Sequence, residues 1–146
     1  MDKIFVSWED YLRRLDLMAE YAQNALKDAE VVVGLIRGGL TPAVFLSHAL
    51  DIPMIAFDPY VLHSGGEERE PVRLPLSPAI IKKVLIVDDI SDTGKTFDKC
   101  TKFFKNRGFQ CTTMSVFINV TTTIFTPDWP GEDSQKKWVV FPYEKE

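Results

Sequence analysis

Nine consecutive residues combine groups that could bind a phosphate and a metal ion together. The segment reads Asp88-Asp89-Ile90-Ser91-Asp92-Thr93-Gly94-Lys95-Thr96, and it follows the apolar run 84–87 directly. A phosphate suits the backbone N–H groups and Thr hydroxyls at a helix start, because the helix dipole favours negative charge there. The carboxylates suit sugar hydroxyls and Mg²⁺, a hard cation that takes oxygen ligands. The pattern predicts a site for a ligand that carries both a phosphate and a metal-bound diol.

A second candidate loop, Arg37-Gly38-Gly39, follows another apolar run at 31–36. Its glycines would let the backbone approach a ligand closely, and Arg37 offers a permanent fork of donors for phosphate. An ordinary glycine turn with a solvated Arg is the alternative for this loop. For the acidic segment the alternative is a carboxylate-rich helix cap without a ligand, although Asp88 and Asp89 side by side repel one another unless something offsets their charge.

Two common phosphate-binding motifs do not fit this chain. Gly94-Lys95-Thr96 resembles the end of a P-loop, but that motif needs a glycine where this chain has Asp89. The stretch 33–39 lacks the GxGxxG spacing of a dinucleotide-binding turn.

The elements that must position these loops alternate between strands and helices. Ser7 and Asp10 resemble a capping box in front of a helix that runs to residue 26, and Gly108 is suited to end another helix. The patterns predict strands at 31–36, 53–57, 84–87, 111–118 and 137–141, and helices at 43–50 and 95–107. Continuous apolar strands that alternate with helices indicate an α/β fold with a mostly parallel sheet covered on both faces. In such sheets ligands bind beyond the carboxyl ends of the strands, where both loops lie.

Composition limits the other possibilities. The chain has 146 residues with 45% apolar and 26% charged residues and a net charge of −4, which fits one globular domain over 1–146. The absence of a basic stretch argues against nucleic acid as a partner, and no apolar run predicts a membrane anchor or a signal peptide. Cys100 and Cys111 are expected to be reduced thiols in a cytoplasmic protein.

The segment 84–96 resembles the signature of the type I phosphoribosyltransferases, which bind 5-phosphoribosyl-1-pyrophosphate (PRPP). Arg37-Gly38-Gly39 stands where that family keeps its pyrophosphate loop. Phe5-Val6-Ser7-Trp8 and Lys137-Trp138-Val139-Val140-Phe141-Pro142-Tyr143-Glu144 resemble the small xanthine-guanine and hypoxanthine branch. The resemblance is weakest at 58–79 and 119–136.

The resemblance implies a role for each matching residue. PRPP would be bound by Arg37, Gly38, Arg69, Asp88, Asp89, Asp92, Thr93, Gly94, Lys95 and Thr96. The base would be bound by Asp92, Asn119, Trp138 and Val139. Asp92, as acid or base near N7, and Arg37, at the pyrophosphate, would be the catalytic residues. Asp89 and Asp88 would hold Mg²⁺, and the family often has a cis peptide bond before this Arg. Residues 58–79 would form a lid that carries Arg69, or else only a mobile hairpin tip, and 119–146 a hood over the base.

The base is less clearly indicated than PRPP. The family usually has Lys-Pro at the end of the strand after the phosphate-loop helix, whereas this chain has Asn119-Val120 and no Lys between Lys105 and Lys136. Asn119 could donate to a 6-oxo group, accept from an amino group, or satisfy local backbone. Trp138 could stack on the base or pack in the core.

We therefore expect a Mg²⁺-dependent enzyme that transfers the phosphoribosyl group of PRPP to a free base, with release of pyrophosphate. A 6-oxopurine is the expected base and purine salvage the expected role, with a homodimer or homotetramer in the cytoplasm. A phosphoribosyltransferase for a different base and a non-catalytic PRPP sensor are the alternatives.

Overall fold

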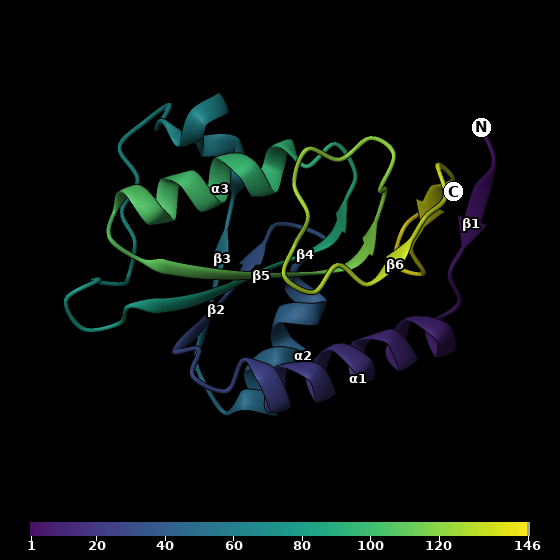
Figure 1. Ribbon diagram of the computed structural model, residues 1–146, viewed down its shortest axis with the longest axis horizontal. Coiled ribbons are helices and arrows are strands. Elements are labelled where there is room, and N and C mark those ends of the chain that lie inside the picture. Colours follow the sequence, from purple (N-terminus) through teal and green to yellow (C-terminus); the bar gives the residue numbers. More distant parts are fainter. Residues whose placement is uncertain (146) are drawn as a thin grey trace.

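A parallel five-stranded sheet with helices on both faces forms the body of the protein (Figure 1). The computed structural model describes residues 1–145. Its elements are β1 (Lys3–Phe5), α1 (Trp8–Ala25), β2 (Val31–Leu35), α2 (Leu40–Leu50), β3 (Met54–Phe57), the 3-10 turns η1 (Pro59–Val61) and η2 (Ser64–Gly66), β4 (Lys83–Ser91), α3 (Lys95–Asn106), β5 (Gln110–Ile118), β6 (Glu132–Asp133) and β7 (Trp138–Val140). The strand order β3-β2-β4-β5-β6, parallel throughout, confirms the predicted fold class.

Alternation along the central strands divides the core into two layers. Val32 and Leu85 pack in one cluster with residues of α1 and α2, whereas Val33 and Ile86 pack in another with residues of α3. Both sets are fully buried, because successive side chains of a strand face opposite sides of the sheet. Burial on both faces explains why these strands have continuous apolar sequences.

Most element boundaries agree with the sequence prediction, and the differences lie at the ends of strands and helices and in two very short strands. β4 continues to Ser91, so Asp88 and Asp89 belong to the strand and not to the loop after it. Helix α2 begins at Leu40, which leaves Pro42 in its first turn, where a proline is tolerated. Strands β1 and β6 were not predicted, because two or three residues are too few to show periodicity.

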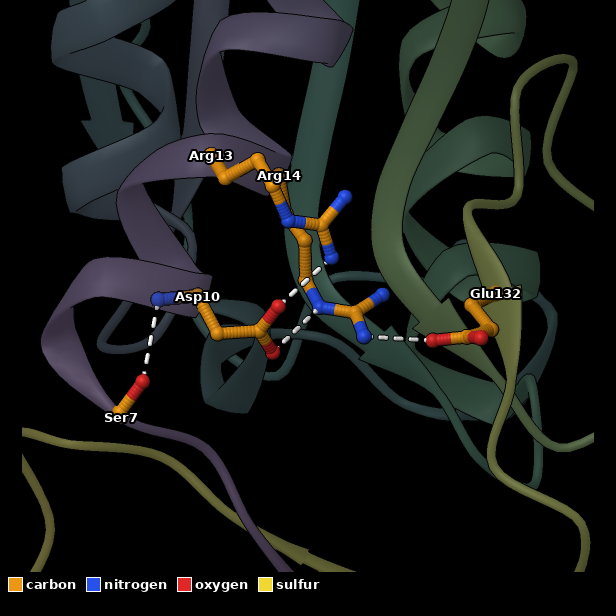
Figure 2. Close-up of polar contacts among 5 residues, drawn as sticks. All are labelled: Ser7, Asp10, Arg13, Arg14 and Glu132. Atoms are coloured by element: carbon orange, nitrogen blue, oxygen red, sulfur yellow. Dashed lines mark hydrogen bonds and ion pairs between the residues drawn. The ribbon is translucent and has the colours of Figure 1, made fainter.

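The two ends of the chain meet in a small second sheet of two strands, of which β7 belongs to the predicted hood. Strand β1 pairs in parallel with β7, and Figure 1 shows both termini at the same end of the molecule. Arg14 links helix α1 to the edge strand β6 of the main sheet: its guanidinium lies 2.9 Å from Asp10 of the same helix and 2.5 Å from Glu132 of β6 (Figure 2). Ser7 caps α1 by accepting from the Asp10 N–H at 3.0 Å, as predicted. The predicted hood, 119–146, ends with Glu146, which lies outside the described residues.

The polar segment 58–79 is packed against α3 over part of its length. Leu62 is fully buried, and a Cβ on Gly66 would lie 2.7 Å from the backbone nitrogen of Phe103. Gly65, in contrast, has open space around its Cα. The structure therefore anchors the first part of the predicted lid to the body of the protein.

The aromatic side chains Phe103 and Phe104 of α3 lie in the core and are not available to an interface with another chain. Phe103 and Phe104 are at most 2% exposed, and they contact one another and Phe57 at ring distances of 5.2 to 5.4 Å. Cys100 and Cys111 are free thiols, as predicted. Within residues 1–145, no helix has the length and apolar character needed to cross a bilayer.

Candidate functional site

The two loops predicted to bind a ligand meet at the carboxyl ends of neighbouring strands. Strands β2 and β4 pair in parallel with Gly34 opposite Val87, so the segments that follow them lie side by side. Residues of both segments line a cavity of about 740 Å³. Its lining consists of Ile36, Arg37, Gly38, Thr41, Pro59, Asp88, Asp89, Thr96, Tyr143, Glu144 and Lys145.

Gly38 and Gly39 allow the first loop to lie directly against β4. A methyl group on Gly38 would overlap the Asp89 carboxylate, and one on Gly39 would overlap the backbone of Val87 and Leu35. Position 39 therefore requires a residue without a side chain, whereas a side chain at position 38 would displace the Asp89 carboxylate. The peptide bond between Ile36 and Arg37 is cis, as the family resemblance implied. Arg37 is exposed and lines the cavity, so its guanidinium is available to an anionic ligand.

Two adjacent acidic residues, Asp88 and Asp89, line this cavity. One carboxylate oxygen of Asp88 accepts from the Asp89 N–H at 2.8 Å, and Oδ2 of Asp89 accepts from the Tyr143 hydroxyl at 3.1 Å. Burial raises the pKa of both carboxyl groups, and the charge of Asp89 raises the pKa of Asp88 further. Ionising both carboxyl groups is therefore unfavourable here, and a bound metal ion would lower that electrostatic cost.

These raised pKa values predict how the stability of the ligand-free protein depends on pH. The ordinary pKa of an Asp carboxyl group is 3.8. Between pH 3.8 and the raised pKa values, the folded protein binds more protons at these two sites than the unfolded chain does. The free energy of unfolding should therefore fall as the pH rises through the raised pKa values. Chemical denaturation with chelator present, from pH 4 to 8, would measure this slope. The D88N/D89N variant should show a shallower fall than the wild type, and two parallel curves would contradict the prediction.

The loop 92–96 is held in place by a second loop, 119–125. The Ile124 N–H donates to the Thr93 carbonyl at 2.8 Å, and a Cβ on Gly94 would lie 2.5 Å from the Thr123 hydroxyl. Gly94 has φ +81°, a conformation that favours glycine, and it forms the start of α3. Of this loop, Thr96 lines the large cavity, which places the N-terminus of α3 beside the ligand space.

A smaller cavity of about 190 Å³ adjoins the large one through Asp89 and Glu144, which line both. Its other lining residues are Ile90, Asp92, Lys137, Trp138, Val139 and Phe141. Trp138 is 52% exposed, so it lies on the cavity side of β7 and not in the core. The smaller cavity therefore offers a ligand both an exposed indole and the Asp92 carboxylate.

Asn119 lies behind this cavity and contacts Asp92. Its Nδ2 donates to Asp92 Oδ1 at 3.1 Å, while its Oδ1 accepts from the Thr121 N–H at 3.3 Å. The Thr122 hydroxyl donates to the Asp92 carbonyl at 2.8 Å. Asn119 is 7% exposed and is absent from the lining of the smaller cavity, so it is placed to orient Asp92.

The structure brings together most of the predicted site residues, but not all of them. Arg69 lies outside the cavity linings: its guanidinium contacts the Tyr60 ring at 5.2 Å and donates to the Leu62 carbonyl at 3.2 Å. The cavity linings also lack three residues of the loop 92–96, namely Thr93, Gly94 and Lys95. The lining residues that sequence reasoning did not assign to the site are Ile36, Thr41, Pro59, Ile90, Lys137, Phe141, Tyr143, Glu144 and Lys145.

Comparisons with known proteins agree with this geometry. A family model described as the phosphoribosyl transferase domain matches residues 7–144. The crystal structure of a purine phosphoribosyltransferase from Pyrococcus horikoshii is 35% identical and has a TM-score of 0.80, covering 100% of this chain and 96% of its own.

Two curated relatives are named xanthine-guanine phosphoribosyltransferase. The protein from Idiomarina loihiensis is 25% identical over 97% of this chain and 87% of its own length. The protein from Gluconobacter oxydans is 27% identical over 95% of this chain and 83% of its own length. The family match covers nearly the whole chain and includes both loops that form the large cavity. This chain belongs to the phosphoribosyl transferase domain family.

Proposed function

We propose that this protein transfers the phosphoribosyl group of PRPP to a 6-oxopurine, with Mg²⁺ bound, and releases pyrophosphate. The observation that carries the proposal is the pair of adjoining cavities. The large cavity offers Arg37 and the α3 N-terminus to phosphates, and the smaller one offers an indole and a carboxylate to a base. Asp89 lines both, so a ribose between the cavities would lie next to it.

The residues of this chain would act on charge and position. Arg37 would stabilise the charge that develops on the leaving pyrophosphate. The dipole of α3, which begins beside Thr96, would hold the 5′-phosphate at the other end of the sugar. Trp138 would hold the base plane, so that the attacking nitrogen meets the anomeric carbon as it gains oxocarbenium character. Asp92, oriented by Asn119, would take or give the proton at N7.

The donor set of the large cavity fits Mg²⁺. Asp88 and Asp89 provide carboxylate oxygens, and Mg²⁺ in proteins is commonly held by one or two carboxylates together with substrate phosphates. Within residues 1–145 no group of three or more His, Cys, Asp or Glu side chains is placed to hold a metal ion by itself. Bound there, Mg²⁺ would supply positive charge to the leaving oxygens.

The proposal of a 6-oxopurine is supported by the relatives. The Pyrococcus horikoshii protein is named a purine phosphoribosyltransferase and the two curated relatives are named for xanthine and guanine. The proposal retains the expectations of a cytoplasmic location and of a homodimer or homotetramer, which cell fractionation and light scattering would test.

A pyrophosphate-release assay tests the proposed function. Purified protein is mixed with PRPP, Mg²⁺ and, separately, hypoxanthine, guanine, xanthine, adenine and orotate. We expect release with at least one of the three 6-oxopurines and none when EDTA replaces Mg²⁺. Release with adenine or orotate alone would overturn the base assignment. PRPP binding by calorimetry without turnover of any base would instead favour a PRPP sensor.

A further inference from the structure

We infer that Lys137 determines base specificity by donating to a carbonyl oxygen of the base from the hood side of the smaller cavity. The inference rests on the proposed function and goes further, because it assigns the residue that would recognise the oxo group. Its basis is the position of Lys137 in the cavity lining, the turn that presents it, and the alternative engagement of Asn119.

A tight turn places Lys137 in the lining of the smaller cavity. The Lys137 N–H donates to the Ser134 carbonyl at 3.0 Å, which closes a four-residue turn between β6 and β7. The two central residues, Gln135 and Lys136, have φ +55° and +65°, a left-handed conformation that is uncommon outside glycine, Asn and Asp. Ser134 is fully buried and its N–H is bonded to the Ile118 carbonyl, so the turn is fixed to the end of β5. The backbone thus presents the residue before Trp138 at a defined place.

Among residues 1–145, Lys137 is the only cationic residue in the lining of the smaller cavity. Three carboxylates share that lining, from Asp89, Asp92 and Glu144. Glu144 is already engaged, since its Oε1 accepts from the Phe141 N–H at 2.9 Å, and Asp89 and Asp92 have the partners described above. Among the described residues the Lys137 ammonium has no hydrogen-bond or ion-pair partner, and the side chain is exposed. Its three N–H donors are therefore available to a ligand.

Asn119, at the strand end where a basic donor was expected, does not compete for this role. Its amide N–H₂ donates to Asp92 and its carbonyl accepts from the Thr121 N–H, so both ends of the side chain are in use. A donor to the base must then come from another element that lines the cavity. Lys137 on the hood lines it, and Trp138, which follows it, provides the ring surface against which the base would lie.

Substrates with a carbonyl group on the base edge that faces the hood would gain from this arrangement. A charged N–H donor gives a stronger hydrogen bond to an oxo group than a neutral amide does. An amino group in the same place would instead face the Lys137 ammonium. Both groups are hydrogen-bond donors, so neither would find an acceptor in the other. The inference therefore names oxo-substituted purines as the favoured class and 6-aminopurines as the rejected class.

Nucleotide binding by calorimetry tests this without requiring turnover. The probes are inosine 5′-monophosphate and purine riboside 5′-monophosphate, which lacks the 6-oxygen. Lys137→Gln should weaken binding of the inosine nucleotide about tenfold and leave the other unchanged, which is the effect of losing one charge-assisted hydrogen bond at an exposed site. Lys136→Gln is the matched control. It removes the same charge from the neighbouring residue, whose side chain is not part of the cavity lining. Lys137→Arg should retain most of the preference.

The outcomes separate the inference from the proposed function. Equal weakening of both nucleotides by Lys137→Gln, or no change in either, would overturn the role of Lys137 and leave the proposed function standing. A Lys136→Gln variant that loses as much as Lys137→Gln would do the same, because it would indicate a general charge effect. A wild-type protein that binds neither nucleotide at millimolar concentration would overturn the proposed function and this inference with it.

Discussion

Replacing Asp92 by asparagine is expected to lower kcat by about 10²- to 10⁴-fold, the usual contribution of a positioned acid or base. The change is close to isosteric, and the amide oxygen that replaces Oδ1 can still accept from Asn119 Nδ2, so the loop should keep its shape. Asp92 lines the smaller cavity and not the larger one. The dissociation constant of PRPP should therefore change little, because the ionisable group is lost where only the base would lie.

Asp98→Asn provides the control for this experiment. Asp98 lies on α3, six residues further along the chain, and its carboxylate pairs with Lys102 at 2.9 Å on the surface. That variant should retain wild-type kcat, since the pair lies outside both cavity linings. Single-turnover rates with excess enzyme and PRPP affinity by calorimetry would be measured for both variants. If Asp92→Asn weakened PRPP binding as much as it slowed turnover, Asp92 would be a binding residue and not an acid or base.

The sheet and the main ligand loops could be predicted from sequence because each is determined locally. The apolar runs at 31–35 and 84–87 are long enough to identify buried strands, and Asp88 and Gly38 lie within a few residues of their ends. Once two parallel strands are neighbours, their carboxyl ends must share an edge. The meeting of both loops at one cavity therefore follows from topology, without knowledge of any distant contact.

Residues contributed by the hood were harder to predict because long-range contacts determine their positions. Tyr143 contacts Asp89 across 54 positions of the chain, and Lys137 reaches the cavity through a turn with two left-handed residues that are not glycine. Neither the turn nor the two-residue β6 has a recognisable sequence signal, so Glu132 could not be placed opposite Arg14. Asn119 was predicted to contact the base because the strand end was correct, but its amide is directed to Asp92.

Arg69 shows the same limitation in a loop. The sequence identifies 58–79 as polar and rich in charge, which predicts exposure but not the surface on which the segment rests. In the structure, burial of Leu62 and the close approach of Gly66 to α3 hold the segment, and Arg69 contacts Tyr60. The position of Arg69 is determined by how this segment packs on α3, and the composition of the segment does not reveal that packing.

Adding one methyl group at Gly38 is expected to lower kcat/KM for PRPP about 10²-fold, the cost of displacing a positioned group by roughly 1 Å. In Gly38→Ala the new Cβ would occupy the space of the Asp89 carboxylate, so that carboxylate must move from the place where Tyr143 holds it. The Mg²⁺ concentration for half-maximal activity should rise as well, because Asp89 is the proposed metal ligand. The midpoint of thermal unfolding should fall only slightly, since Gly38 has no positive φ and its backbone accepts alanine.

Gly65→Ala distinguishes this effect from a general cost of replacing glycine. A Cβ there would meet open space, although its φ of +87° makes any side chain mildly unfavourable. We expect Gly65→Ala to lose some stability with no change in the Mg²⁺ requirement, and Gly38→Ala to show the reverse. Titrating Mg²⁺ at fixed PRPP in both variants measures the contrast directly. If Gly38→Ala kept the wild-type Mg²⁺ requirement, the contact between the first loop and Asp89 would have no part in metal binding, and the metal would have to be held by groups other than Asp89.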